Sequence, residues 1–585
     1  MPNECNQNAI GSCAETEGSM TTANGEASHA EGFQTTANGG SSHAEGNTTT
    51  AGGSASHVEG YNTETMADAA HAEGSSTLAS GIASHAEGSI TISSGSASHA
   101  EGIQTTASGT ASHTEGSNTL AEGTASHAEG FMTSASVNTA HAEGSSTRAN
   151  GLASHAEGYL TITSGVGSHA EGVATQAEGV ASHAEGSSSL ASGNASHAEG
   201  NLTIASANAS HAEGSNTRAL NLYAHAEGNL TFSSGIASHA EGENTVASGL
   251  ASHAEGQGTL ARGESSHAEG DQTEAGGRAS HAEGNLTFAS GSFAHVEGQR
   301  SIASGDLSHA EGNQTQASGQ NSHAEGALSI ASGFTSHAEG VNTVSSGFFS
   351  HTEGQSTNAN FLEGVHVMGK FGAANELAYS WYLANGTDAS TPSLAAKILS
   401  NGNIKIDGSV TTPAADYAEM FETVDGNSID FGYFVTLEGN KVRIANAQDK
   451  YILGITSAKP AFLADSGELR WKNKYLTTEW GEILYKDITL PSVFDSEGNI
   501  ILPKRIERRP LLNPAWDASI DYLPRSQRIE WVAIGLLGKL LIRDNGLCKS
   551  NDYCMPNDQG IAEPSDGGYR VLQRTAPNQI LIMFK

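Results

Sequence analysis

The sequence predicts an all-β protein, a parallel β-solenoid followed by a mainly β C-terminal domain. A histidine recurs at every fourteenth position from His29 to His351, in 24 copies without an insertion or deletion. In every copy a glutamate follows two residues later, and a glycine comes directly after it. From Asn3 to Thr391 the chain has no proline, whereas all five tryptophans lie from Trp381 onward. A repetitive region therefore gives way to an ordinary globular one.

The 14-residue unit, H-A-E-G-x-x-T-x-A-S-G-x-A-S, describes one coil of the solenoid. Two glycines seven residues apart, such as Gly88 and Gly95, suit tight turns that need a positive φ. The second glycine is replaced in only a few copies. Two turns and two short strands fit into 14 residues, which predicts one flat coil per repeat.

Strand alternation assigns the side chains of each coil to two faces. His85 and Glu87 are expected to point outward, as is Ile92 on the other sheet. The small residues of opposite parity are expected to fill the interior: Ser84, Ala86, Thr91 and Ser93. So thin a roll cannot bury a sizeable core alone. An ordered outer column of histidine and glutamate therefore implies a partner, most simply the same column of another copy.

The repeats resemble the head of the YadA-type trimeric adhesins, a left-handed parallel β-roll of 14-residue units of the form S-V-A-I-G-x-x-S-x-A-x-G. Residues 84–88, Ser-His-Ala-Glu-Gly, match the first half of that motif, and Thr91, Ser93 and Gly95 match the second half. The resemblance covers residues 11–357 and implies a homotrimer. This sequence departs from the family by placing His and Glu where Val and Ile meet at the trimer axis.

The histidines and glutamates are predicted to form a structural network at the trimer axis, with no metal. Metal ligation, and a catalytic or proton-conducting role, remain alternatives. Pairing with carboxylates is expected to raise the histidine pKa, so that the shaft is most stable between about pH 4.3 and 6.5 and loosens in alkali. Part of this predicted trimer-axis column comprises His85, Glu87, His99, Glu101, His113, Glu115, His127 and Glu129.

After the array, the segments "ADYAEMFE" and "YILGITSAKP" resemble the self-cleaving C-terminal intramolecular chaperone of phage pre-neck appendages. The resemblance implies that this domain brings three chains together and then cuts before the motif aspartate. The predicted cleavage site is Ala415–Asp416, and Asp416 and Glu419 are the predicted catalytic carboxylates. Related phage domains are associated with ATP, but the sequence contains no phosphate-binding loop, and we expect no cofactor.

Two chemical roles for these carboxylates stay open. Carboxylates three residues apart can share a proton, so that one acts as general acid and the other as general base. Alternatively, Asp416 attacks the adjoining amide itself. Either route makes the protein at most a single-turnover, self-cleaving peptidase. The predicted organisation is an N-terminal tip (1–14), the β-roll (15–357), a β connector (358–412) and the self-cleaving domain (413–585).

The sequence therefore predicts a homotrimeric, adhesin-like fibre, either a phage tail appendage or a spore-surface filament that binds an unidentified surface receptor. A glycan-degrading tailspike, a membrane-anchored adhesin and a purely structural fibre without self-cleavage are the alternatives. The net charge of −36 argues against nucleic acid and anionic membranes as partners. No signal peptide and no membrane-spanning run are evident, so we expect a virion or a spore or cell exterior. The four cysteines are expected to be unpaired, with disulfides at the N-terminal tip as the alternative.

Overall fold

The computed structural model describes residues 6–467, 473–494, 498, 500–502 and 504–585. The chain divides into two compact units, residues 1–407 and 408–585. Within the described residues both units consist of β-strands, turns and loops, and the one helical segment is the 3₁₀ turn η1 (Arg525–Gln527). This confirms the predicted all-β class. No helix in the described part of the chain is long and apolar enough to cross a membrane.

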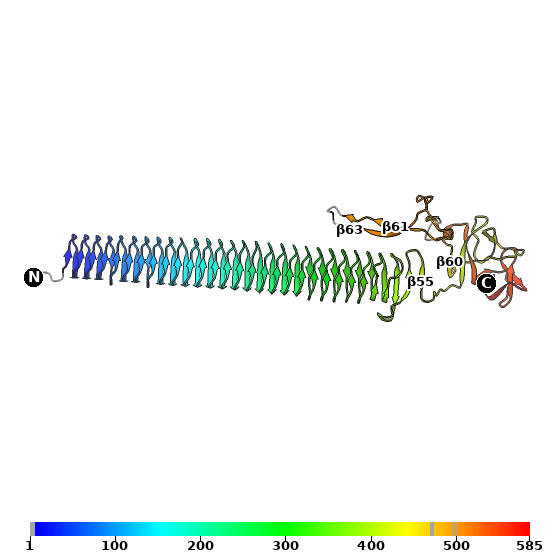
Figure 1. Ribbon diagram of the computed structural model, residues 1–585, viewed down its shortest axis with the longest axis horizontal. Helices are drawn as coiled ribbons and strands as arrows, with labels where there is room; N and C mark the ends of the chain where they lie inside the picture. Colours follow the sequence, from blue (N-terminus) through cyan, green and yellow to red (C-terminus); the bar gives the residue numbers. More distant parts are fainter. Residues whose placement is uncertain (1–5, 468–472, 495–497, 499, 503) are drawn as a thin grey trace. The chain divides into compact units, whose positions relative to one another are not determined.

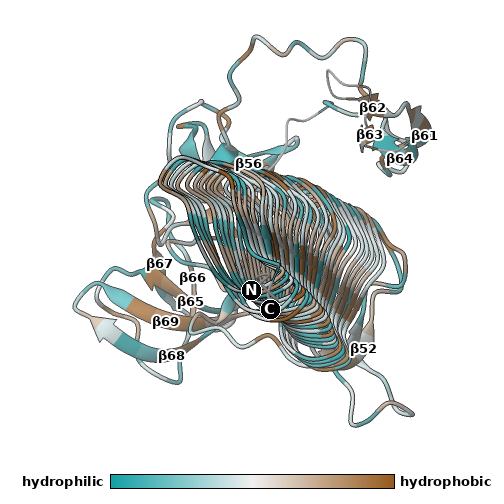
Figure 2. Cartoon of the chain, turned by 90° about the vertical axis from the view of Figure 1, so that its left-hand side faces the viewer, coloured by the Kyte–Doolittle hydropathy of each residue, from teal (hydrophilic) through white to brown (hydrophobic). Residues whose placement is uncertain are grey.

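The first unit is a parallel β-solenoid that begins at β1 (Asn8–Ala9), and it ends in two antiparallel strands, β54 (Leu394–Ile398) and β55 (Ile404–Ile406) (Figure 1). One coil comprises β12 (His85–Ser89) and β13 (Ile92–Ser93), and the next begins with β14 (His99–Ala100). Strands β12 and β14 pair in parallel with His85 opposite His99, a register of 14 residues. Seen end-on, successive coils superimpose, so that equivalent residues form columns (Figure 2).

The interior of each coil is filled by small side chains, as strand parity predicts. Ser84, Ala86, Thr91 and Ser93 are at most 1% exposed, and the core along the array is almost entirely alanine, serine and threonine. The hydroxyl of Ser84 donates a hydrogen bond of 2.7 Å to the Gly81 carbonyl, which satisfies a buried turn. The core is therefore thin and continuous, and the long side chains point outward.

The turns differ from the sequence prediction at one of the two glycines. Gly88 has a φ of 107°, as expected, but Gly95 does not have a positive φ. A Cβ on Gly95 would lie 1.9 Å from the carbonyl oxygen of the next coil, so this glycine is needed for close packing between coils. The other left-handed positions are Ala83 and Ile90, with φ of 54° and 62°.

Parallel pairing continues beyond residue 357. Strand β52 (His366–Ala373) pairs with β50 (His351–Thr352), the last strand of the regular 14-residue array, and β53 (Trp381–Asn385) pairs with β52. His366, although fifteen residues from His351, stacks on that ring at a centroid distance of 4.5 Å. Trp381 then meets His366 edge-on at 4.9 Å. An aromatic ring thus closes the histidine stack.

The second unit is built on one mainly antiparallel sheet with the strand order β58-β57-β59-β65-β69-β68-β66-β67. Strand β56 pairs antiparallel with β65 and parallel with β60. Two small hairpin sheets, β61–β64 and β62–β63, complete the unit. Its strands are β56 (Asp416–Glu422), β57 (Phe434–Glu438), β58 (Lys441–Ile444), β59 (Gly454–Thr456), β60 (Phe462–Ala464), β61 (Tyr485–Leu490), β62 (Val493–Phe494), β63 (Ile500–Leu502), β64 (Arg505–Pro510), β65 (Trp531–Arg543), β66 (Tyr553–Pro556), β67 (Ala562–Ser565), β68 (Tyr569–Ala576) and β69 (Gln579–Phe584).

Large aliphatic and aromatic side chains form the core of this unit, among them Phe434, Ile542 and Ile582. Cys548 and Cys554 belong to the same core and are unpaired, and burial raises their pKa to about 11 and 12. Cys13 is exposed and also free, whereas Cys5 lies outside the described residues. Cys548 and Cys554 are thus buried thiols, as expected, whereas Cys13 is exposed.

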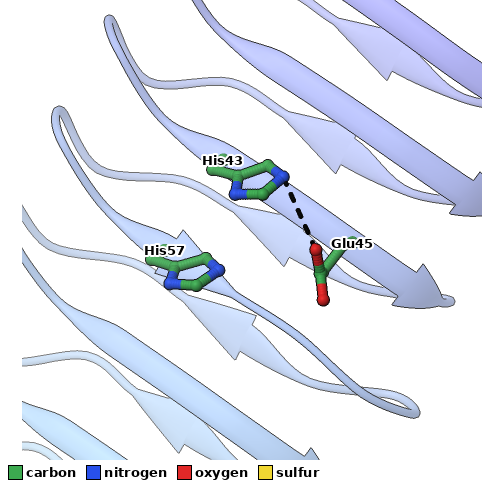
Figure 3. Close-up of side chains that lie close together, drawn as sticks. All are labelled: His43, Glu45 and His57. Carbon is green, nitrogen blue, oxygen red and sulfur yellow. Dashed lines mark ion pairs between the residues drawn. The ribbon is translucent and has the colours of Figure 1, made fainter.

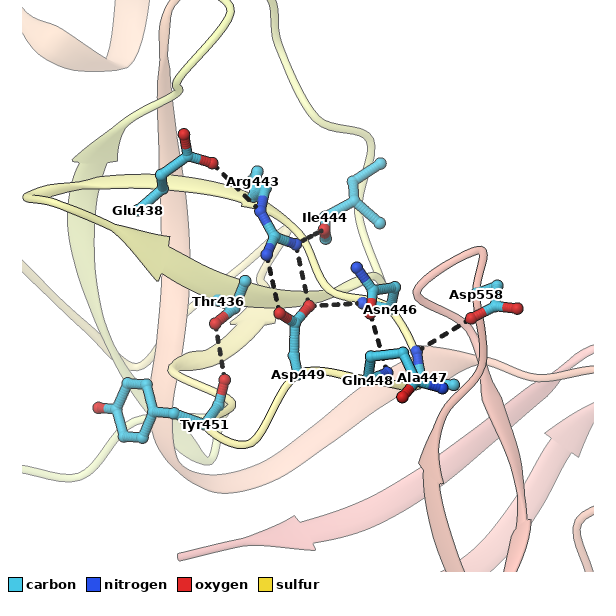
Figure 4. A network of polar contacts seen from close by, with 10 residues as sticks. All are labelled: Thr436, Glu438, Arg443, Ile444, Asn446, Ala447, Gln448, Asp449, Tyr451 and Asp558. Carbon is cyan, nitrogen blue, oxygen red and sulfur yellow. Dashed lines mark hydrogen bonds and ion pairs between the residues drawn. The ribbon is translucent and has the colours of Figure 1, made fainter.

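A bidentate ion pair fixes the loop after β58. The guanidinium of Arg443 donates to both carboxylate oxygens of Asp449 at 2.9 and 2.7 Å (Figure 4). Asp449 also accepts a hydrogen bond of 2.8 Å from the Asn446 N–H, and the hydrogen bonds from Arg443 hold the pKa of Asp449 below its usual range. These bonds stabilise the turn that returns the chain toward β59.

Candidate self-cleavage site

The predicted cleavage site lies at the beginning of β56. Asp416 is the first residue of this strand and stands opposite Gly538 of β65. Its carbonyl accepts a hydrogen bond of 2.8 Å from the Ala461 N–H, just before β60. Asp416, which follows the predicted scissile bond, is therefore held between β65 and the segment before β60.

Asp416 is a buried carboxylate with one close hydroxyl partner. Its side chain is on the inward face of β56, and the residue is 6% exposed. The Ser457 hydroxyl, directly after β59, donates a hydrogen bond of 2.6 Å to Asp416 Oδ2. This bond fixes the carboxyl group next to the peptide that precedes it.

Strand β65 approaches the Ala415 carbonyl closely. The Lys539 N–H donates to the Ala415 oxygen at 3.3 Å. The preceding residue is Gly538, with a φ of 118°, and a Cβ there would lie 2.2 Å from that same oxygen. A backbone N–H directed at a carbonyl oxygen is the arrangement that stabilises the negative charge formed when the carbonyl carbon is attacked.

Glu419 lies on the other face of β56. Side chains alternate along a strand, and the pattern of buried Asp416, Ala418 and Met420 leaves Glu419 on the outward side. Its Oε1 accepts a hydrogen bond of 2.8 Å from the Tyr417 hydroxyl, which raises the pKa of Tyr417. Within one chain, the two predicted carboxylates are therefore not placed to share a proton.

A cavity of about 1130 Å³ opens beside the cleavage site. Ala415, Asp416 and Ser457 line it, together with the cationic side chains of Lys459 and Lys539. Glu419 is not among the lining residues, in agreement with its outward position. The cavity offers water access to the Ala415–Asp416 bond.

Comparison with known proteins finds a family that this region resembles. Residues 374–579 match the family Peptidase_G2, the IMC autoproteolytic cleavage domain. The C-terminal part of the chain is therefore similar to the Peptidase_G2 family over these residues. The match includes residues 415–539, which contain every residue of the site geometry described above.

Curated relatives resemble this chain over a limited length. A pre-neck appendage protein of Bacillus phage B103 is 35% identical over 179 residues, 30% of this chain and 19% of that protein. The pre-neck appendage protein of Bacillus phage phi29 is 37% identical over 145 residues, 24% of this chain and 16% of that protein. This chain thus spans about a fifth of the length of the curated relatives it matches. A crystal structure of the C-terminal fragment of phi29 gene product 12 is 32% identical, covers 29% of this chain and 100% of the fragment, and gives a TM-score of 0.24.

Sequence analysis missed three residues beside the predicted cleavage site. Ser457 lies within "YILGITSAKP", a segment that we matched to the family without assigning this residue a role. Gly538 and Lys539 interrupt the apolar run of β65, but nothing in the sequence links them to Asp416. Only the pairing of β56 with β65 brings them to the scissile peptide.

The predicted axis column is a regular ladder on the first unit. The rings of His85 and His99 stack at 4.6 Å with an interplanar angle of 3°, and the same stacking extends along the array. His85 Nε2 lies 3.5 Å from Glu87 Oε2, and their side chains are 34% and 33% exposed. The column therefore faces outward on a single chain.

The expected rise in histidine pKa was wrong. Burial, followed by the positive charge of the stacked neighbours, lowers the pKa of His85 to about 4, and the same causes act on His225 and His351. These effects outweigh the nearby carboxylates. Among the glutamates, a hydrogen bond with Glu59 and then burial raise the pKa of Glu73 to about 7, while that same bond lowers the pKa of Glu59.

These shifts reverse the predicted pH dependence of the array. A histidine with a lowered pKa contributes stability fully above its unfolded value of about 6.5, and loses it as the pH falls toward 4. A glutamate raised to about 7 contributes below its unfolded value of about 4.3 and loses that contribution as the pH rises through 7. The histidines with lowered pKa outnumber the glutamates with raised pKa, so we expect maximal stability near neutral pH.

Thermal melts of the metal-free full-length protein test this expectation. The transition of the repeat array should occur at least about 5 °C lower at pH 5 than at pH 7. At pH 9 the transition temperature should fall by less relative to pH 7, because there only the ionised glutamates destabilise the array. A higher melting temperature at pH 5 than at pH 7 would restore the charged-pair hypothesis.

Proposed function

We propose that this protein is a homotrimeric fibre of the phage-appendage type, whose Peptidase_G2 domain aligns three chains and then cuts its own chain at Ala415–Asp416. The observation that supports self-cleavage best is the buried Asp416 carboxyl next to a peptide carbonyl held by the Lys539 N–H. The pre-neck appendage relatives support a place on a virion. The partner outside the trimer is a surface receptor.

The geometry favours direct attack by Asp416 over a proton-sharing pair within one chain. The free carboxylate oxygen adds to the Ala415 carbonyl carbon, and the Lys539 N–H stabilises the resulting oxyanion. The C–N bond then breaks as a water molecule gives a proton to the Asp416 nitrogen, which leaves a hydroxide ion and an anhydride between Ala415 and the Asp416 side chain. Water hydrolyses this anhydride, and one water is consumed overall. A shared-proton mechanism instead needs Glu419 from a neighbouring chain.

Trimer formation is proposed from the outward histidine–glutamate ladder. A column of one composition over 24 coils is unusual for a free surface, whose residues normally vary. Three copies of the thin roll can bury these columns against one another, which supplies the contact area that a single alanine-filled coil lacks.

Electrophoresis and N-terminal sequencing of the purified full-length protein test the cleavage assignment. We expect a small fragment that begins at Asp416 and ends at Lys585, and a large fragment that ends at Ala415. Boiled and unboiled samples should differ, because the repeat array stays trimeric without boiling. A small fragment that begins at another residue would contradict the assigned site.

A further inference from the structure

The histidine–glutamate ladder holds donor atoms that its own contacts do not satisfy. The Nε2 atoms of His43, His57 and His85 are buried and have no hydrogen-bond partner among the described residues. Their closest carboxylate oxygens lie 3.5 to 4.0 Å away. Good N–H···O hydrogen bonds span about 2.7–3.2 Å, so these pairs are too far apart to satisfy each other.

The separation of these atoms matches the space that a bound metal ion needs. Two ligands of a tetrahedral zinc ion, each about 2.0–2.1 Å from the metal, lie about 3.4 Å apart. His43 Nε2 and Glu45 Oε2 are 3.8 Å apart (Figure 3). The ligand atoms of His43, Glu45 and His57 all lie within 4.8 Å of one another, and the same trio recurs at His85, Glu87 and His99. Small side-chain rotations can bring each trio onto one ion.

We propose that the ladder binds divalent transition-metal ions, each held by the imidazole and carboxylate of one coil and those of the next. Imidazole nitrogen together with carboxylate oxygen is a donor set suited to Zn²⁺, Ni²⁺ and Cu²⁺ rather than to Mg²⁺ or Ca²⁺. Because the rings of adjacent coils are 4.5–4.9 Å apart, two rings must tilt toward each other to share an ion. Ring pairs that share an ion should therefore alternate with pairs that do not.

Charge balance determines how many metal ions the ladder binds per coil. Each coil adds one carboxylate to the ladder, so one divalent ion neutralises two coils. One ion in every coil would place doubly charged ions about 4.8 Å apart with an excess of positive charge. With 24 histidine–glutamate coils, we expect about 12 ions per chain. This number concerns the single chain and does not depend on self-cleavage.

Metal analysis of the full-length protein tests the proposal. After treatment with a chelator, the protein is dialysed against micromolar Zn²⁺, and the bound metal is measured by mass spectrometry. About 12 ions per chain are expected, and Co²⁺ in place of Zn²⁺ should give the strong visible absorption of tetrahedral sites. One ion per chain or fewer, or the weak absorption of octahedral Co²⁺, would overturn the proposal.

Two matched sets of glutamate-to-glutamine substitutions separate the ladder from general negative charge. The ladder set should lose about three ions per chain, and the control set, on outward positions of the repeat array that are outside the ladder, should lose none. Equal losses in both sets contradict the proposal. If the ladder set fails to fold, shown by its circular dichroism, the Co²⁺ spectrum of the unmodified chain decides. The ladder set is Glu87, Glu101, Glu115, Glu129, Glu143 and Glu157, and the control set is Glu26, Glu64, Glu122, Glu178, Glu243 and Glu264.

Discussion

Replacing Asp416 by alanine is expected to stop self-cleavage, with a rate at least about a thousandfold below that of the unmodified chain. The substitution removes the carboxylate that adjoins the scissile peptide, while the Ala415 carbonyl keeps its hydrogen bond from Lys539. The fraction of uncut chain, followed over days by denaturing electrophoresis, measures the effect. Cleavage at the same bond and at an unchanged rate would remove Asp416 from the mechanism.

Variants around the site distinguish chemistry from folding. Asp566→Ala changes an exposed carboxylate in the same domain and should leave cleavage unchanged. Ser457→Ala removes the 2.6 Å hydrogen bond to Asp416 and should slow cleavage about 10- to 100-fold, through poorer positioning of the carboxyl group. Ser457→Thr keeps the hydroxyl and should recover most of the rate. Equal rates in the alanine and threonine variants would deny Ser457 this positioning role.

The same assay shows whether Glu419 acts on its own chain or on a neighbouring chain. Because Glu419 is on the outward face of β56, a Glu419→Ala chain that fails to cut itself should be rescued only if another chain supplies the carboxylate. Co-production with Asp416→Ala chains provides that second source in mixed assemblies. Cutting of the Glu419→Ala chain in the mixture would identify an interchain mechanism, and its absence would restrict the chemistry to one chain.

The solenoid could be predicted closely because the length of the repeat determines the geometry of each coil. A strict 14-residue repeat fixes the register, and strand parity then separates the buried Ala86 and Thr91 from the outward His85. The turns were less predictable. Ile90 adopts a φ of 62°, although β-branched residues disfavour that region, because its place in the coil decides its conformation and its side chain does not.

The electrostatics and the site partners could not be predicted, for a different reason. The sequence shows each histidine next to its own glutamate. The pKa of His85 is lowered by burial and then by the charges of His71 and His99, which lie in the coils 14 residues away in both directions. Likewise, Ser457 and Lys539 reach Asp416 only through the pairing of distant strands. Local patterns do not contain such long-range contacts.

Deleting residues 413–585 from the gene is expected to prevent correct assembly of the repeats. Every coil pairs through the same kind of residues, as His71 does with His85 and His85 with His99. In the proposed trimer, a chain displaced by one coil loses only one layer of contacts out of 24, so the repeats barely distinguish the right alignment from the wrong one. Most of the truncated product, above about four-fifths, should be monomer or aggregate in analytical ultracentrifugation.

Removal of the same domain after assembly should have little effect. A protease site inserted between residues 408 and 412 of an uncut Asp416→Ala chain allows the domain to be cut off once the trimer exists. The aligned repeats then keep all layers in contact, and a slip now requires every layer to separate at once, which makes the misaligned states kinetically inaccessible. The expected result is a discrete trimer of the same sedimentation rate as the naturally cleaved product. If the truncated gene gives this trimer as well, the alignment information lies in the repeats, and the C-terminal domain has no role in assembly.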